Sequence, residues 1–183
     1  MDIPLADLKI QYTTIKREVD DAIQNVIDET AFVKGGYVKA FEESFAKKNG
    51  VNYCVGVANG TDAIYISLRA LRIGKGDEVI TTAFSWISTA ETIQQTGAVP
   101  VFVDIHPDTY NIDVSKIEEK ITSRTKAILP VHLYGQPADM APIVDICERY
   151  DLKLIEDSAQ AHFAEYNGQV VGNLGDAATF SFY

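Results

Sequence analysis

The chain has 183 residues, of which 46% are hydrophobic, and its 16 basic and 26 acidic side chains give a net charge of −10. The apolar share is typical of globular proteins, which excludes a disordered chain and predicts one sizeable domain. The acidic balance disfavours nucleic acid and anionic membrane surfaces as partners, because both carry negative charge. No run of residues approaches the ~18 apolar positions of a membrane-spanning helix.

The cysteines and the first residues of the chain indicate the cellular compartment. Cys54 and Cys147 lie in apolar segments and form no C-x-x-C pair, which is typical of reduced, buried thiols. The opening stretch, MDIPLADLKIQ, has no basic region followed by an apolar run, so we expect no signal peptide. Together these features predict a cytoplasmic protein. We expect no metal site.

Helix-like and strand-like segments alternate along the chain. Apolar residues spaced three and four apart predict helices, and short apolar runs predict strands. The expected helices cover residues 17–29, 38–48, 61–73, 88 to about 97, a short one from 115, and 140–150. The expected strands cover residues 52–57, 78–82, 99–103, 126–133, 152–156 and 177–183, with a loop or hairpin at 167–175. Two capping boxes, Ser88–Glu91 and Ser115–Glu118, predict helix starts.

This order of elements predicts the fold. Strands that alternate with helices of about ten residues imply crossover connections and a mostly parallel sheet. The runs VPVFV (99–103) and AILPV (127–131) lack in/out alternation, as expected when both faces are covered. We therefore predict an α/β protein of three layers, α/β/α, with a mostly parallel central sheet.

In such a sheet, ligands bind beyond the carboxyl ends of the strands. One strand end runs into Asn59-Gly60-Thr61-Asp62, where a helix begins. A helix N-terminus offers unpaired N–H groups and a positive dipole end, which suit a phosphate. The alternative, favoured when the motif is taken alone, is that Asn59 or Thr61 only caps the helix. The P-loop pattern is absent.

A second strand end is LIEDSAQAH (154–162), in which Asp157 lies one residue beyond its strand. A semi-buried carboxylate needs a partner, and no Arg or Lys is adjacent in the sequence. Either a distant side chain or a positively charged ligand would supply the charge. Gln160 and His162 are near enough to reach the same region, although His162 alone is expected to be packed or solvated rather than catalytic.

Two further residues complete the pattern. Ser181 is a lone hydroxyl in an apolar strand, ordinarily a surface serine, and Trp86 is the only tryptophan. A lone tryptophan is usually a core residue, but at the ligand edge of a sheet it can lie flat on an aromatic ring. A phosphate cradle, a carboxylate seeking a cation, an aromatic plate and a hydroxyl match the needs of pyridoxal phosphate.

The segments NGTDA (59–63), EDSAQAH (156–162) and GDAATFSFY (175–183) resemble the DegT/DnrJ/EryC1/StrS family. These are pyridoxal phosphate-dependent sugar aminotransferases of the aspartate aminotransferase fold (fold type I). The resemblance extends, in the family's order, through PLADLKIQY, GDEVITTAFSWISTAETI, PVFVDI, DTYNID and LPVHLYGQPADM. It implies amino transfer, commonly from glutamate, to a nucleotide-diphosphate-linked keto sugar in amino-sugar biosynthesis, by a homodimer with shared active sites.

The resemblance also implies residue roles. Gly60 and Thr61 would hold the phosphate and Ser181 would add a bond to it. Trp86 would stack on the ring, Gln160 would contact the ring oxygen, and Asp157 would pair with the pyridinium nitrogen. No lysine here matches the family's Schiff-base lysine, which follows the SFY stretch by a few residues, whereas this chain ends at Tyr183.

We therefore expect residues 1–183 to form the large, cofactor-binding domain, truncated at its C-terminus and without the smaller C-terminal domain. Two alternatives stay open. Some relatives carry histidine at the lysine position and remove a sugar hydroxyl, which would make the protein a dehydratase. A non-catalytic relative that binds a cofactor or sugar nucleotide is the other.

Overall fold

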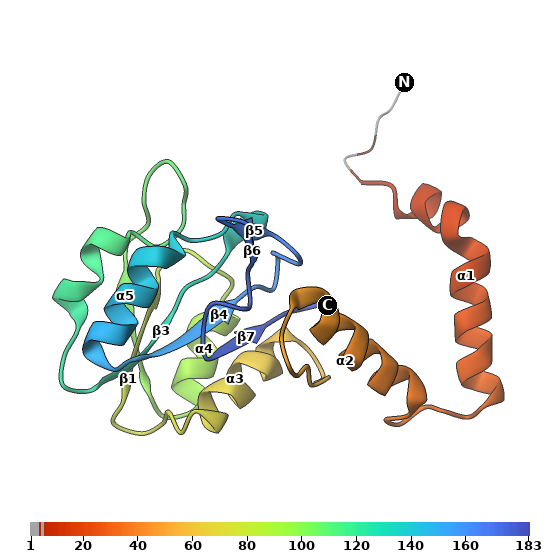
Figure 1. Ribbon diagram of the computed structural model, residues 1–183, viewed down its shortest axis with the longest axis horizontal. Helices are drawn as coiled ribbons and strands as arrows, with labels where there is room; N and C mark the ends of the chain where they lie inside the picture. Colours follow the sequence, from red (N-terminus) through yellow and green to blue (C-terminus); the bar gives the residue numbers. More distant parts are fainter. Residues whose placement is uncertain (1–3, 5) are drawn as a thin grey trace. The chain divides into compact units, whose positions relative to one another are not determined.

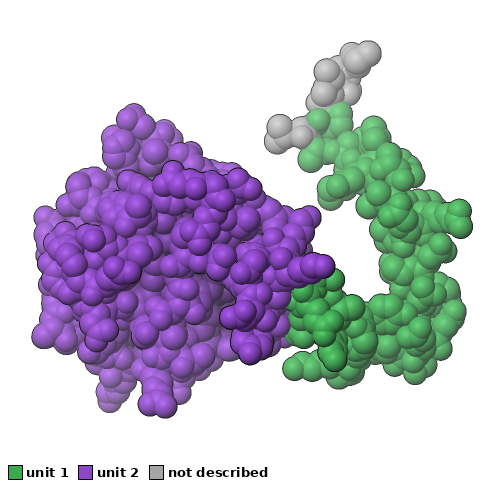
Figure 2. Space-filling model, in the orientation of Figure 1, with its two compact units in different colours: residues 1–45 green, residues 46–183 purple. Residues whose placement is uncertain are grey.

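The computed structural model describes residue 4 and residues 6–183. Part of the stretch on which the expected lack of a signal peptide depends, residues 1–3 and 5, lies outside the described residues. The chain forms two units, residues 1–45 and residues 46–183 (Figure 2). Among the described residues, no helix is long and apolar enough to cross a membrane.

The first unit contains α1 (Leu8–Asp28) and most of α2 (Gly36–Asn49). Asp7 caps α1, because its side chain accepts a hydrogen bond from the backbone N–H of Ile10. The helix therefore begins nine residues before the predicted start at Arg17. No residue of α1 is buried, although Leu8 and Ile23 on it are apolar and 75% and 55% exposed.

The second unit is built on a five-stranded sheet in the order β2-β1-β3-β4-β7. Its four pairings are all parallel. The strands are β1 (Glu78–Thr82), β2 (Val99–Val103), β3 (Thr125–Leu129), β4 (Lys153–Asp157) and β7 (Ala177–Thr179). The helices are α3 (Gly60–Ala70), α4 (Ser88–Gln95) and α5 (Met140–Tyr150), with 3-10 turns η1 (Val114–Lys116), η2 (Glu118–Lys120) and η3 (Leu133–Gly135).

Helices cover both faces of this sheet, as Figure 1 shows. Ile80, Ile128 and Leu154 face a cluster that includes Ile143 of α5. Their neighbours along the strands face a second cluster, formed with Ile64 and Leu68 of α3 and Ile93 of α4: Val79, Ala127, Leu129 and Ile155. Side chains alternate between the two faces of a strand, so β1, β3 and β4 each contribute to both clusters. The predicted three-layer α/β/α fold with a parallel sheet is confirmed.

Several local predictions are wrong for physical reasons. Residues 52–57 belong to neither sheet, and Tyr53 and Val55 are 88% and 71% exposed, because β-branched and aromatic residues form a strand only beside a partner strand. The run VPVFV is an edge strand with Phe102 48% exposed, not a strand covered on both faces. Asp113, not Ser115, caps η1, and it accepts hydrogen bonds from the N–H and hydroxyl of Ser115.

The segment before β7 is a hairpin followed by a tight loop. β5 (Glu165–Tyr166) and β6 (Gln169–Val170) pair antiparallel around Asn167-Gly168, both with positive φ, as the two-residue hairpin turn requires. Gly172 has φ +88°, and an added Cβ there would lie 2.6 Å from the Phe180 ring. The loop therefore packs closely against the last strand of the sheet.

Gly172→Ala tests this packing, with Gly168→Ala as the matched control. Both glycines have positive φ, but an added Cβ at Gly168 meets nothing within 4 Å. We expect Gly168→Ala to lower the free energy of unfolding by about 1–2 kcal/mol through backbone strain, and Gly172→Ala by at least about 1 kcal/mol more through steric overlap. Urea unfolding of both variants measures the difference, and equal losses would contradict the close packing.

Candidate functional site

Two of the predicted site residues, Asp157 and Ser181, lie where parallel strands end. Asp157 is the last residue of β4 and Ser181 follows β7 by two residues. Asp157 pairs with Thr179 in the sheet register, and the N–H of Ser158 donates to the carbonyl of Thr179 at 2.8 Å. The carboxyl ends of β4 and β7 therefore meet at one edge of the sheet, as the parallel topology requires.

Gly60, at the start of α3, meets Ser181 directly. A Cβ added to Gly60 would lie 2.8 Å from Cβ and 3.1 Å from Oγ of Ser181. Only glycine allows this approach, so the backbone N–H groups at the start of α3 and the Ser181 hydroxyl border the same small region. The structure thus brings together two residues that lie 121 positions apart in the chain and to which the family resemblance gives one phosphate site.

At the start of α3, the cap and the predicted phosphate donors are different groups. Asn59 is the cap: its side chain accepts from the N–H of Asp62 at 2.8 Å. Capping by Asn59 was one of the two alternatives, and it leaves the N–H groups of Gly60 and Thr61 without an intrahelical partner. The hydroxyl of Thr61 is not used as a cap and instead lies 2.8 Å from the hydroxyl of Ser88.

The predicted capping box at Ser88–Glu91 is wrong. The cap position of α4 is Ile87, which makes no side-chain cap bond, and Ser88 is the first residue inside the helix. Its hydroxyl bonds to Thr61 on α3 because the packing of α3 against α4 offers it a buried partner away from its own helix.

Asp157 is a buried carboxylate, 4% exposed, with few donors. Oδ1 accepts from the N–H of Ala159 at 3.2 Å and Oδ2 from the hydroxyl of Thr89 at 3.1 Å. Burial raises the pKa of the Asp157 carboxyl above its ordinary value, and the two hydrogen bonds oppose this shift without cancelling it. Within residues 6–183, no Lys or Arg forms an ion pair with Asp157.

The neighbouring acid, Glu156, is completely buried but fully partnered. Oε1 accepts from the N–H groups of Leu174 and Gly175, at 2.8 and 2.9 Å, and Oε2 accepts from the N–H of Gly172 at 2.8 Å. Nε2 of His132 lies 3.1 Å from the same Oε2. Burial by itself raises the pKa of Glu156, but the bonds from His132 and the loop amides outweigh it and hold the pKa below its ordinary value.

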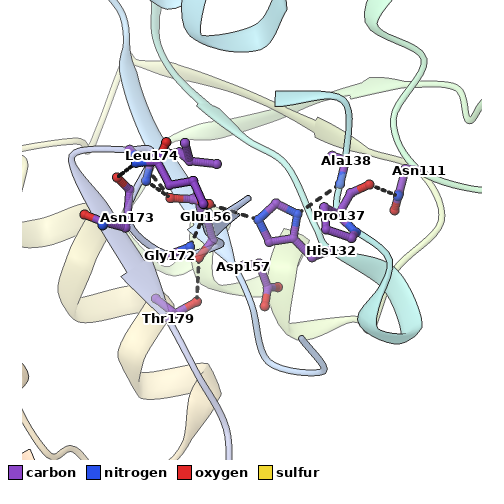
Figure 3. A network of polar contacts seen from close by, with 12 residues as sticks. Asn111, His132, Pro137, Ala138, Glu156, Asp157, Gly172, Asn173, Leu174 and Thr179 are labelled. Atoms are coloured by element: carbon purple, nitrogen blue, oxygen red, sulfur yellow. Dashed lines mark hydrogen bonds and ion pairs between the residues drawn. The ribbon is translucent and has the colours of Figure 1, made fainter. Parts of the chain in front are cut away.

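His132 is neutral in this arrangement. Its Nδ1 accepts the backbone N–H of Ala138 at 3.0 Å, so the ring proton is assigned to Nε2, which donates to Glu156. Figure 3 shows the ring of His132 between Glu156 and Ala138, and the side chain of Asp157 outside this run of hydrogen bonds. The two adjacent acids therefore differ in their bonding. Glu156 binds the backbone N–H groups of the loop before β7, whereas the oxygens of Asp157 can still accept a hydrogen bond from another group.

The other predicted residues lie on loops at this edge. Gln160 is exposed, and its Oε1 accepts the backbone N–H of Tyr134 at 3.1 Å. That bond leaves the amide NH₂ of Gln160 as the donor for a ligand oxygen. Trp86, between β1 and α4, is 75% exposed and is therefore not a core residue. The ring of His162 packs at 5.5 and 4.7 Å from the rings of Phe180 and Phe182, as a packed histidine does.

These side chains suit a flat, phosphate-bearing cation. The amide groups at Gly60 and Thr61 and the Ser181 hydroxyl offer donors, while Asp157 offers a buried negative charge. Sequence reasoning missed the contacts of the hydroxyls of Ser88 and Thr89, because STAE (88–91) was interpreted as a capping box. It also missed the partnership of Glu156 with His132, although side-chain alternation in the strand could have shown that Glu156 and Asp157 face opposite sides.

Comparisons with known proteins show which proteins this chain is similar to. A sequence profile described as the DegT/DnrJ/EryC1/StrS aminotransferase family matches residues 13–183. The chain is 51% identical over 98% of its length to a dTDP-3-amino-3,6-dideoxy-alpha-D-galactopyranose transaminase from Aneurinibacillus thermoaerophilus. It is 49% identical over its full length to a protein from Geobacillus stearothermophilus named as a pleiotropic regulatory protein. The chain spans about half the length of these relatives, 50% and 49%.

Solved structures are similar to this chain as well. The crystal structure of S. venezuelae DesV in complex with a ketimine intermediate is 42% identical, with a TM-score of 0.95 over 99% of this chain and 49% of that one. The structure of an E. coli GDP-4-keto-6-deoxy-D-mannose-3-dehydratase with bound hydrated PLP is 40% identical, with a TM-score of 0.84 over 89% of this chain and 43% of that one.

Glu156→Gln tests the buried network, with exposed Glu148→Gln as the control. Both carboxylate oxygens of Glu156 accept hydrogen bonds, but glutamine has only one acceptor oxygen. Its NH₂ group would therefore face N–H groups, which are donors and cannot accept a hydrogen bond. We expect a loss of about 3 kcal/mol or more in the free energy of unfolding at neutral pH. Because the pKa of Glu156 is lowered by folding, its contribution exists above its ordinary pKa and disappears as the pH falls through its folded pKa. Urea unfolding across pH checks both; a loss equal to that of Glu148→Gln would refute the network.

Asp157→Asn tests the opposite balance at the neighbouring acid. Because folding raises the pKa of Asp157, ionisation of this carboxyl destabilises the folded state as the pH rises above its ordinary pKa. The destabilisation reaches its full size above the folded pKa. In the cofactor-free protein we expect Asp157→Asn to raise Tm at pH 8 and to raise it less at pH 4. Exposed Asp108→Asn should show no such trend. Scanning calorimetry decides, and a lower Tm for Asp157→Asn at pH 8 would mean that the carboxylate already has a strong partner.

Proposed function

The chain belongs to the DegT/DnrJ/EryC1/StrS aminotransferase family, and on that premise we propose that the whole protein is a pyridoxal phosphate-dependent aminotransferase. It moves an amino group from an amino acid, expected to be glutamate, to a nucleotide-diphosphate-linked keto sugar in amino-sugar biosynthesis. The names of similar proteins support this substrate class, since several are transaminases of dTDP-linked or UDP-linked sugars.

The observation that carries the proposal is the buried carboxylate of Asp157, which lacks a cationic partner within residues 6–183. A protonated pyridine nitrogen is the ligand group that suits it, because it brings both a positive charge and one N–H donor. Neither the Ala159 amide nor the Thr89 hydroxyl can neutralise the charge. A structural ion pair would have supplied an arginine or lysine at this position.

The remaining residues would hold the rest of the cofactor. The N–H groups of Gly60 and Thr61 would bind the phosphate at the N-terminus of α3, with Ser181 as a further donor. Trp86 would cover one face of the ring, and the amide NH₂ of Gln160 would donate to the ring oxygen. When bound, pyridoxal phosphate supplies an electron-accepting ring, and Asp157 would keep the ring nitrogen protonated so that this capacity is retained.

A homodimer in the cytoplasm is part of the proposal. The apolar residues on α1 support the dimer, because Leu8, Ile23 and Ile27 are 75%, 55% and 49% exposed in the single chain, and exposed apolar faces mark interaction surfaces. Sedimentation of the full-length protein measures the oligomeric state directly.

Turnover by the full-length protein tests the proposed activity. With glutamate and a dTDP- or UDP-linked keto sugar we expect 2-oxoglutarate and the amino sugar in equal amounts, detected by mass spectrometry. Loss of a sugar hydroxyl without amino transfer would identify the dehydratase alternative, and cofactor binding with neither product would identify the non-catalytic one. Asp157→Asn should lose most activity, and an unchanged rate would remove Asp157 from the proposal.

A further inference from the structure

The first turn of α4 presents two adjacent hydroxyls to two different parts of the site. Ser88 and Thr89 are buried, at 7% and 2% exposure. The Ser88 hydroxyl lies 2.8 Å from that of Thr61, at the phosphate end of the site, and the Thr89 hydroxyl lies 3.1 Å from Oδ2 of Asp157. Consecutive residues of one helix therefore contact both groups that the proposed cofactor would bridge.

The direction of the bonds at Thr89 follows from counting protons. A hydroxyl has one proton, and an ionised carboxylate can only accept, so Thr89 donates to Asp157. The hydroxyl of Ser85, 2.9 Å away, must then donate to Thr89. The relay Ser85–Thr89–Asp157 holds Oδ2, while the N–H of Ala159 holds Oδ1. With a donor on each oxygen, the carboxylate cannot rotate without losing a bond.

Other buried threonines of α4 behave differently. Thr92 donates to the carbonyl of Ser88 at 2.7 Å, which is the usual bond of a threonine to the preceding turn of its own helix. Thr96, just after the helix, donates to the carbonyl of Ile93 at 2.7 Å in the same way. Thr89 instead directs its hydroxyl to the end of β4. This difference marks Thr89 as a residue that serves the site.

We propose that Thr89 is a positioning residue that, with Ser85 behind it, aims the Asp157 carboxylate at the ring nitrogen of the cofactor, while Ser88 does the same for Thr61 at the phosphate. The proposal deepens the proposed function and rests on the assignment of Asp157 to the pyridine nitrogen. The other titratable groups close to Asp157 are His132, held neutral by its bonds, and Glu156, which faces the opposite side of the sheet.

Thr89→Val, Thr89→Ser and Thr92→Val test the proposal in the full-length protein. Valine matches the shape of threonine without the hydroxyl, serine keeps the hydroxyl, and Thr92→Val makes the same change elsewhere on α4. In the cofactor-free protein, ¹³C NMR of labelled aspartate measures the titration of Asp157. We expect Thr89→Val to raise the pKa of Asp157, because a donor to the charged form is lost, and the other two variants to keep the wild-type titration.

With pyridoxal phosphate bound, we expect Thr89→Val to lower kcat about tenfold with little change in KM, and Thr89→Ser to restore kcat. Should Thr89→Val fail to fold, Ser85→Ala keeps the test open, since it removes only the donor behind Thr89 and should shift the titration in the same direction by less. An unchanged Asp157 titration in Thr89→Val, or in Ser85→Ala if Thr89→Val does not fold, would overturn the proposal.

Failure of the proposed function gives a different result. NMR of ¹⁵N-labelled pyridoxal phosphate reports whether the ring nitrogen is protonated in the wild-type protein. An unprotonated nitrogen there would refute the assignment of Asp157, even if the titration of Asp157 responds to Thr89→Val. A protonated nitrogen with a wild-type Asp157 titration in Thr89→Val would refute the role of Thr89 alone.

Discussion

The buried carboxylate of Glu156 and its four N–H donors are the interaction on which the site depends. Three donors come from the backbone of the loop before β7, and the fourth is His132. The loop leads directly into β7, and Ser181, two residues after β7, lies against Gly60. An unpaired charge in the protein interior would be unfavourable. Here the hydrogen bonds to the Glu156 carboxylate hold the loop against β4 and so fix the position of β7 and Ser181.

Asp157 shows the opposite balance, one residue further along. It has two donors, a raised pKa and no basic partner within residues 6–183. Stability would favour a neutral residue here, so we propose that the acid is present to bind a ligand rather than to stabilise the fold. The contrast between neighbours of similar chemistry separates a structural acid from a candidate functional one, which residue type alone does not do.

Sequence patterns predicted the sheet well and the hydroxyl contacts poorly. β1, β2 and α5 have the predicted bounds because short apolar runs and helical periodicity report burial directly. Residues 52–57 were wrong because strand propensity carries no information about a pairing partner. The rule of strand ends placed Asp157 and Ser181 at one edge of the sheet. The contacts of Ser88 and Thr89 were not predictable, since a serine or threonine near a helix start also suits a cap.

Because Glu156 and Asp157 are adjacent on β4, their different roles depend on the register of β4 in the sheet. If β4 shifted by a single residue against β3 and β7, Asp157 would turn toward the loop amides and Glu156 toward the cofactor edge. The longer side chain of Glu156 would then occupy the space that the Asp157 side chain fills. The loop before β7 would also lose its hydrogen bonds to Glu156. Insertions or deletions of one residue in β4 should therefore be among the changes that evolution tolerates least in this chain.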